Sequence, residues 1–334
     1  MAERPVTRGA VHPRPAGLAR SLHPPASISN LPTGQCGMPT PNIHQTLSNS
    51  GLSPGDLALL ASRMQALPAL PTAVSQLLAL LAKDSASPAE VEAIVKVDAA
   101  LTAKTLALAN SARFGLRRQV SAVAQATSLL GTRRLRDLLM CASLARAMPA
   151  TLAGYGMDAR AAWLHNAGTA VLSEELARRV APALSADAFT AGLLHDVGKL
   201  AIGALVERHW PELASAIQDR GLTFAEAERA TLGIGHSEVG ELVLERWALP
   251  RAFPAVARWH HEPAGAPEEL RSLVGLVHVA SSLAHTFGFG ADQAGLCRST
   301  QDSVRAALGL TRSVVEASVA DALPRVQELA ESMS

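Results

Sequence analysis

Aromatic residues are scarce in this chain of 334 residues, where six Phe, four Trp and one Tyr make up only 3% of the sequence. Hydrophobic residues nevertheless reach 48%, so Ala, Leu and Val must fill the interior. Ala and Leu favour helices, and the alternating runs of Val, Ile and Tyr that indicate strands are missing. The sequence therefore predicts an all-α protein, long enough to bury one large core or two modest ones.

Cysteine and net charge are low as well. The three cysteines, Cys36, Cys141 and Cys297, are far apart and odd in number, which excludes a disulfide framework and a CxxC metal site. A formal net charge of +1 gives no overall attraction to nucleic acids or membranes. No apolar run has membrane-spanning length, and the N-terminus lacks the apolar core of a secretory signal. We therefore expect a cytoplasmic protein that does not bind membranes.

The first 55 residues differ from the rest of the chain. Residues 1–55 are rich in Pro, Gly, Ser, Thr and Asn, with only scattered apolar residues. Such a segment cannot bury enough apolar surface to offset the entropy lost on ordering. We predict a disordered N-terminal tail. A true translation start at Met38 is an alternative that the sequence leaves open.

From Asp56 onward the chain is predicted to form consecutive helices. The tetrapeptide Ser87-Pro88-Ala89-Glu90 is a capping box with proline at the first helical position. Asp98 is expected to cap the next helix, and Gly115 is a plausible end for it. Further helices are predicted at about 120–130, 132–147, 158–180, 187–204, 211–219, 223–231, 237–247, 251–260, 267–287, 302–309 and 312–332.

A break in this series divides the chain. The segment "PATLAGYGM" (149–157) interrupts the helices with one proline and two glycines. We therefore expect an N-terminal helical lobe over 56–150 and a second lobe over 151–285. Residues 286–334 are expected to form helices that pack on this domain.

The second lobe contains a set of histidine and aspartate residues with metal-binding potential. Its members are His165, His195, Asp196, His236, His260 and His261. Imidazole and carboxylate ligands suit a divalent transition metal, and helical bundles often gather such ligands from several helices. A carboxylate that bridges two ions would let one activate water while both stabilise phosphoryl charge. Lys199 lies close to His195 and Asp196 in the sequence, so it could pair with an oxygen of a phosphate bound at such ions.

Each member also has an ordinary structural explanation when taken alone. A lone helical histidine such as His165 is more often packed in the core or near a helix end than bound to a metal. The run His260-His261-Glu262 fits a polar helix end, where histidine is favourable to the helix dipole. His209 and His285 have no partner in the pattern and are interpreted as structural.

Several motifs together resemble a known family. "LLHDVGKL" (193–200) resembles the central motif of HD-domain proteins, a helical fold whose catalytic members are metal-dependent phosphohydrolases. The resemblance narrows to the HDOD family through the segments "LPALPTAVSQLLALL" (67–81), "VDAALTAKTLALANSARFG" (97–115), "VSAVAQATSLLGTRRLRDLL" (120–139), "GIGHSEVGELVLERWALP" (233–250) and "WHHEP" (259–263). It covers about residues 60–285 and implies an HD-like helical bundle, here in two lobes.

The resemblance also implies a ligand set. A first metal would be held by His165, His195, Asp196 and a later Asp, whose place in this chain is taken by Ser281. A second metal would be held by Asp196, His236, His260 and His261. The implied cofactor is one or two divalent ions of iron, manganese or zinc, and the loss of one carboxylate leaves open whether metal binds. Water, Glu238 or Glu262 could fill the open position, since catalytic metal sites keep one.

Two functions follow from these observations. The related HD-GYP phosphodiesterases carry a GYP motif soon after the paired histidines, whereas this chain has "EPAGAPEELRSL" there and Gly154-Tyr155-Gly156 elsewhere. The missing motif and Ser281 favour a bacterial regulatory protein that relays a signal through a protein partner or a nucleotide ligand. The alternative is a metal-dependent phosphohydrolase acting on a nucleotide or cyclic dinucleotide, with Lys199 assisting catalysis.

Nucleic-acid binding is a weaker third interpretation. It depends on six arginines in the N-terminal lobe: Arg113, Arg117, Arg118, Arg133, Arg134 and Arg136. A cluster of this kind could contact phosphates. Arginines at such spacings more often form solvated faces that cover apolar neighbours, so we do not expect nucleic acid as a partner.

Overall fold

The computed structural model describes residues 50–68, 72–81, 87–109, 120–148, 151–290 and 302–331. The predicted tail up to residue 49, the predicted helix end at Gly115 and three of the six arginines, Arg113, Arg117 and Arg118, lie outside these residues. Within them the prediction of an all-α protein is confirmed, because every regular element except one pair of short strands is helical.

The elements follow one another closely along the chain. In order they are α2 (Pro54–Ala66), α3 (Thr72–Leu81), α4 (Pro88–Val95), α5 (Ala99–Ala109), α6 (Val123–Leu130), α7 (Thr132–Ala147), β1 (Thr151–Leu152), η3 (Ala153–Tyr155), β2 (Met157–Asp158), α8 (Ala159–Val180), η4 (Pro182–Leu184), α9 (Ser185–Leu194), α10 (Lys199–Arg208), α11 (Trp210–Arg220), α12 (Phe224–Leu232), α13 (His236–Arg246), α14 (Ala252–Trp259), η5 (Pro263–Gly265), η6 (Glu268–Leu270), α15 (Arg271–Thr286), α16 (Asp302–Ala307) and α17 (Arg312–Glu331).

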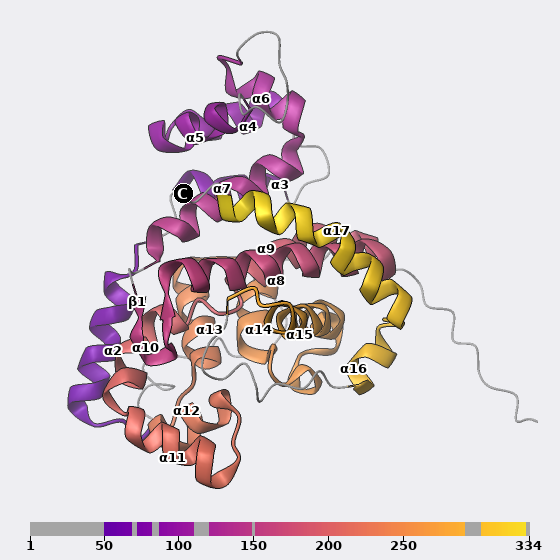
Figure 1. Cartoon of the computed structure of the whole chain (residues 1–334). Coiled ribbons are helices and arrows are strands. Elements are labelled where there is room, and N and C mark those ends of the chain that lie inside the picture. The colour runs from indigo at the N-terminus through magenta and orange to yellow at the C-terminus, as the bar shows by residue number, and fades with distance from the viewer. Residues whose placement is uncertain are drawn as a thin grey trace, which may run out of the picture.

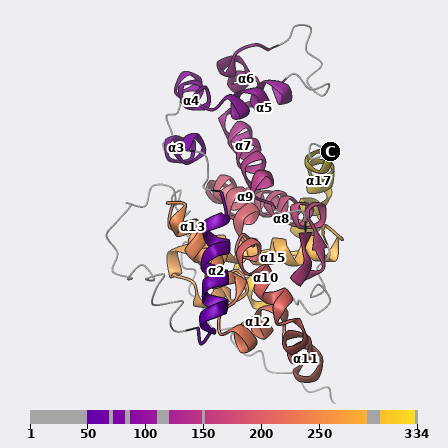
Figure 2. The ribbon, with the colours of Figure 1, turned by 90° about the vertical axis from the view of Figure 1, so that its left-hand side faces the viewer.

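The helices form two groups (Figure 1). The upper group contains α3 to α7, and Figure 2 shows α7 running down from it toward α8 and α9. The lower group is built around α8, which packs against α9, α15 and α17. Helix α2 precedes the upper group in the chain but packs on α10 of the lower group. The lower group contains every predicted ligand.

Two of the predicted helix starts are confirmed by their caps. The Ser87 hydroxyl accepts a hydrogen bond from the backbone N–H of Glu90, and the Glu90 carboxylate accepts one from the backbone N–H of Ser87, so the capping box of α4 is complete. Asp98 Oδ1 accepts a hydrogen bond of 3.0 Å from the backbone of Leu101 and caps α5 as expected. These caps are local in sequence, which is why the sequence alone predicts them.

One pair of short strands lies at the predicted break between the helices. β1 and β2 pair antiparallel, with Thr151 opposite Asp158 and Leu152 opposite Met157. Gly156 adopts a left-handed conformation, with φ of 65°, that closes the intervening turn at low steric cost. Strands of two residues are too short to show an alternating pattern, so periodicity could not predict them.

The single helix predicted over 187–204 is wrong, because the chain turns at residues 195–198 between α9 and α10. Gly198 lies at the end of this turn, against α13. A Cβ atom at this position would collide with the carbonyl oxygen of His236 and the amide nitrogen of Gly240. The close approach of α13 therefore requires glycine here, and it places His195 and Asp196 in the turn.

One helical stretch of the described chain, Pro182–Arg208, is long and apolar enough to cross a membrane, judged by length and composition alone. The comparison is weak evidence for a span, because 94% of its most apolar window is buried inside the fold. Core helices of folded domains pass the same test.

Helix α17 is attached to α8 through buried charges. Arg325 donates hydrogen bonds of 2.5 Å to Glu174 and 2.5 Å to Glu175, whose side chains are almost fully buried. On the same face, Arg179 pairs with Asp321 at 2.5 Å. Charge-assisted hydrogen bonds of this kind are stronger than those between neutral groups. The C-terminal helix is therefore held on the lower group by specific ion pairs.

The interpretation of the arginine cluster as a solvated face is wrong for Arg136. This side chain is only 6% exposed, and its guanidinium pairs with the buried carboxylate of Asp137. An arginine engaged in this way is not available to a phosphate.

Asp137, on α7, makes the stability of the folded protein depend on pH. Burial raises the pKa of Asp137 from 3.8 to about 6, although the charge of Arg136 opposes the rise. Between these two pH values the folded protein retains a proton that the unfolded chain releases. The group's contribution to stability is therefore present below about pH 4 and is lost as pH rises to about 6.

We accordingly expect Asp137→Asn to gain stability relative to wild type as pH rises from 4 to 7. The difference in the free energy of unfolding should change by up to about 3 kcal/mol over this interval. Urea denaturation of both proteins at a series of pH values measures it. A difference that is independent of pH would contradict the raised pKa.

Candidate metal centre

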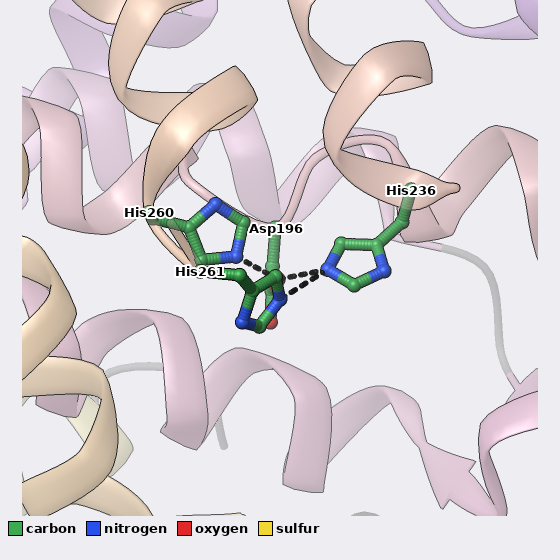
Figure 3. A group of neighbouring side chains, drawn as sticks. All are labelled: Asp196, His236, His260 and His261. Carbon is green, nitrogen blue, oxygen red and sulfur yellow. Dashed lines mark hydrogen bonds and ion pairs between the residues drawn. The ribbon is translucent and has the colours of Figure 1, made fainter. Parts of the chain in front are cut away.

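All six predicted ligands lie at one buried point of the lower group. His165 belongs to α8, His195 and Asp196 to the turn before α10, and His236 begins α13. His260 and His261 follow the end of α14, and Figure 3 shows their rings gathered with His236 around Asp196. The structure therefore brings together residues that are up to 96 positions apart in the sequence, between His165 and His261.

The ligand atoms form two groups that share one carboxylate. Asp196, His236, His260 and His261 each offer an atom within 4.8 Å of the others, and so do His165, His195 and Asp196. The two oxygens of Asp196 are divided between these groups. Oδ1 lies 3.5 Å from Nε2 of His236 and 3.5 Å from Nε2 of His260. Oδ2 lies 3.3 Å from Nε2 of His195 and 3.5 Å from Nε2 of His165.

In three of the histidines, the ring nitrogen Nδ1 already takes part in a hydrogen bond. Nδ1 of His195 donates to the carbonyl of Gly192 at 2.7 Å, and Nδ1 of His260 donates to the carbonyl of Ala257 at 2.8 Å. Nδ1 of His236 donates to Glu228 at 2.6 Å. Donation from Nδ1 leaves a lone pair on each Nε2, which is the arrangement found behind metal-ligating histidines.

These lone pairs make the cluster fit a cation. In the described part of the chain, Nε2 of His195 and Nε2 of His260 are buried and make no hydrogen bond. Each faces an oxygen of Asp196 at a distance that is repulsive between a lone pair and a carboxylate. On the Oδ1 side a divalent ion would convert this repulsion into coordination, and on the Oδ2 side the Lys199 ammonium, 2.7 Å from Oδ2, opposes it. The buried His/Asp cluster can therefore bind a metal, and the identity of the ion remains a prediction.

The protonation states agree with this interpretation. Burial lowers the pKa of His195 well below its usual range and lowers that of His260 to about 4, despite the neighbouring Asp196 carboxylate. Burial also acts to raise the pKa of Asp196, but the Lys199 ammonium 2.7 Å away opposes it, and that pKa stays well below its usual range. Neutral imidazoles and an ionised carboxylate are the forms that bind metals.

Two residues that support the cluster were not predicted from the sequence. Glu228 on α12 is fully buried and accepts hydrogen bonds from the backbone of His236 at 2.7 Å and from its ring. The hydroxyl of Tyr155 donates to the same carboxylate at 2.5 Å. One signal was available: Glu228 lies midway between Phe224 and Leu232 at helical spacing, so a carboxylate occupies the apolar face of a helix.

Glu228→Gln is expected to weaken metal binding. The amide keeps the shape of the carboxylate but loses its charge and one of its acceptors, so it orients His236 less well. Loss of such an outer partner typically costs about 10–100-fold in metal affinity. Titration of the metal-free protein with Zn²⁺ measures the change. Glu212→Gln on exposed α11 is the control and should match wild type; equal affinities for Glu228→Gln and wild type would show that Glu228 does not orient the ligand.

Lys199 lies beside the cluster, as its place in the sequence predicts. Its Nζ is 2.7 Å from Oδ2 of Asp196 and 5.2 Å from the centre of the Tyr155 ring. A hollow of about 230 Å³, including its opening to solvent, reaches this side of the cluster. Its lining combines polar and apolar residues: His165, Asn166, Asp196, Lys199, Met148, Leu152, Met157, Ala162 and Leu200.

Helix α15 covers the cluster from another side. His278 Nδ1 donates to the carbonyl of His260 at 2.8 Å, and the His285 ring lies 4.2 Å from the His165 ring between centres. Ser281 is buried on the same helix face, between these two contacts. His285 belongs to neither group of possible ligands, and its ring packs against that of His165. His209 instead pairs with Asp56 at 3.3 Å.

The two glutamates expected to fill an open metal position are engaged elsewhere. Glu238 Oε1 accepts a hydrogen bond of 3.0 Å from Arg229, and Glu262 pairs with the same guanidinium at 2.5 Å. Neither carboxylate belongs to the two groups of possible ligands within the residues that the structure describes. That expectation is corrected: Arg229 neutralises both carboxylates outside the cluster.

Comparisons with known proteins agree with this fold. The chain is 26% identical over 225 residues to an uncharacterized protein of Treponema pallidum (strain Nichols), a match that covers 67% of this chain and 43% of that protein. The chain thus spans less than half the length of this relative. Among solved structures, an HDOD domain protein of unknown function from Geobacter sulfurreducens aligns with a TM-score of 0.64 and 21% identity, over 87% of this chain and 98% of that one.

Two further structures have the same fold. A Shewanella amazonensis SB2B protein whose name proposes a phosphohydrolase aligns with a TM-score of 0.63 and 23% identity, over 83% of this chain and 98% of that one. A Marinobacter aquaeolei VT8 protein whose name proposes signal transduction aligns with a TM-score of 0.62 and 20% identity, over 86% and 68%. At these identities the likeness establishes the fold alone.

The family profile of the HDOD domain matches residues 67–263. This range contains the upper helix group and all six residues of the cluster, and it confirms the resemblance inferred from the sequence motifs. The chain belongs to the HDOD domain family.

Proposed function

We propose that this chain is a regulatory HDOD protein in which the metal centre organises the fold and does not turn over a substrate. The observation that carries the proposal is the burial of the ligands. His195, Asp196, His236 and His260 are each no more than 3% exposed. The hollow beside the cluster touches Asp196 alone among these four residues, and its volume of about 230 Å³ includes space that is open to solvent. The enclosed part of this hollow is too small for a nucleotide or cyclic dinucleotide beside the ligands.

The placement of the ligands suits a regulatory role. They come from α8, the α9–α10 turn, the start of α13 and the end of α14, and an ion bound by Asp196, His236, His260 and His261 would tie the last three of these segments together. Because metal binding of this kind is coupled to folding, metal content would set how firmly these segments hold one another. We propose that a cytoplasmic protein partner recognises this state, with a nucleotide as the alternative ligand. Iron, manganese and zinc all suit the donor set.

A second candidate, a metal-dependent phosphohydrolase, is favoured by one specific observation. The hollow beside the cluster is lined by His165, Asp196 and Lys199, and this combination could hold a water molecule or a phosphate group next to a ligand carboxylate. The name of the Shewanella amazonensis protein points in the same direction. The missing fourth ligand at Ser281 and the small hollow place this candidate second.

Metal content and turnover distinguish the two functions. We expect the purified full-length chain to contain iron, manganese or zinc, and Asp196→Asn to lose most of it, because Asp196 is the carboxylate that both ligand groups share. We expect wild type to hydrolyse neither nucleotides nor cyclic dinucleotides. Elemental analysis and chromatographic separation of the nucleotide products measure these quantities. Turnover that disappears in Asp196→Asn would overturn the regulatory function.

A further inference from the structure

The two sides of Asp196 differ in charge. Oδ2, which faces His165 and His195, already has a cation next to it, the Lys199 ammonium at 2.7 Å. Oδ1 faces the Nε2 atoms of His236 and His260, and His261 Nε2 lies 2.9 Å from that of His236. The Oδ1 side thus offers four ligands and the Oδ2 side offers three ligands with an ammonium group among them.

A second metal ion bound to Oδ2 of Asp196 would lie too close to the Lys199 ammonium. Since Nζ is 2.7 Å from Oδ2, an ion bound to the same oxygen at ~2.0–2.2 Å would lie within about 5 Å of Nζ. Lys199 and Asp196 are each 3% exposed, so little water is present to screen the repulsion between a divalent ion and the ammonium. Lys199 would have to leave the cluster before the ion could bind.

The balance of buried charge leads to the same conclusion. Among the described residues, the acids of the cluster and its hydrogen-bond partners are Asp196 and Glu228, and with Lys199 they give a net charge of −1. One divalent ion changes this to +1, whereas two would change it to +3. Buried charge is costly unless opposite charges compensate it, so the cluster accommodates one ion far better than two.

We propose that the centre takes a single divalent ion on the Oδ1 side and that the Lys199 ammonium permanently occupies the place of a second ion on the Oδ2 side. This inference rests on the proposed metal centre. The ligands of the single ion are Asp196, His236, His260 and His261. His165 and His195 then belong to the surroundings of an Asp–Lys ion pair and bind no metal.

The first test compares the two sides by titration of the metal-free, full-length protein with Co²⁺, followed by visible absorption and elemental analysis. We expect one equivalent for wild type. His261→Ala should lose at least the ~10–100-fold in affinity that follows loss of an outer partner, while His165→Ala keeps one equivalent and is affected far less. Two equivalents for wild type, or an equal loss in His165→Ala and His261→Ala, would overturn the inference.

The second test changes the ammonium itself. Lys199→Met removes the charge and keeps the apolar stem, so a second equivalent of Co²⁺ should bind, more weakly than the first. Lys199→Arg keeps the charge and should stay at one equivalent, as should Lys96→Met, which changes an exposed lysine paired with Glu92. Circular dichroism checks that each variant is folded. If Lys199→Met also stays at one equivalent, Lys199 does not exclude a second ion.

Failure of the underlying metal centre gives a different result. In that case folded wild type binds no Co²⁺ at all, and both the centre and the inference are wrong. Binding of two equivalents leaves the centre intact and overturns only the role given to Lys199.

Discussion

The Gly198→Ala variant is expected to lose about 3 kcal/mol or more of its free energy of unfolding and to lose its metal as well. The added methyl group would meet the carbonyl oxygen of His236 and the amide nitrogen of Gly240, both of which are backbone atoms. Backbone cannot rotate away as a flexible side chain can, so α13 must shift. Since Gly198 follows Asp196 by two residues and the collision is with His236, two ligands move with it.

A control for this variant lies five residues further along the same segment. A Cβ atom at Gly203 would meet no atom closer than Leu152 Cδ2 at 3.5 Å, which is ordinary contact. Gly203→Ala in α10 should therefore stabilise the protein by about 0.5–1 kcal/mol through helix propensity. Urea denaturation and elemental analysis of both variants measure the effects. Equal unfolding midpoints for the two variants would contradict the close approach of α13 to Gly198.

The Arg325→Ala variant is expected to destabilise the protein by about 3 kcal/mol, a typical cost of leaving a buried charge without its partner. Arg325 pairs with Glu174 and Glu175 at 2.5 Å each, and these carboxylates are 0% and 3% exposed. Arg178 also pairs with both, at 2.7 Å and 3.1 Å, so the glutamates keep part of their compensation. Because of this loss of stability, α17 should detach from α8 before the rest of the protein unfolds.

Arg312→Ala on the same helix is the matched control for this variant. Arg312 pairs with Glu316 at 2.7 Å, one helical turn away, but both side chains are largely exposed to solvent. Exposed pairs of this kind contribute little, so its unfolding midpoint should equal that of wild type. Limited proteolysis and hydrogen exchange of α17 measure the release. Protection of α17 in Arg325→Ala equal to that in Arg312→Ala would mean that apolar packing alone holds the helix.

The sequence predicted those parts of the fold that depend on neighbouring residues. The capping box at Ser87 and Glu90 and the cap at Asp98 act within three positions, and the structure has both. The need for glycine at position 198 could not be predicted from the apolar run around it, because it comes from α13, which begins 38 positions later with His236. The strands on either side of Gly156 are too short to show any period.

The site shows the same division. The adjacent pairs His195-Asp196 and His260-His261 are conspicuous in the sequence, and the structure brings them together with His165 and His236. Their support comes from distant residues: Tyr155 reaches Glu228 across 73 positions, and His285 meets His165 across 120. No spacing rule connects such pairs. Glu238 and Glu262 looked available because their partner Arg229 is identifiable only in three dimensions.

Helix α8 contributes a histidine to the cluster and, farther along, the two glutamates that hold α17. His165 and Glu174 are nine residues apart, which in an α-helix is about 14 Å. Metal binding and the packing of α17 on α8 could influence each other through this helix. If they do, thermodynamic reciprocity makes the coupling free energy the same in both directions. A partner that binds the released form of α17 ten times more tightly when the metal is present must also make the metal bind ten times more tightly. The affinity of the metal would then report on a partner that never touches it.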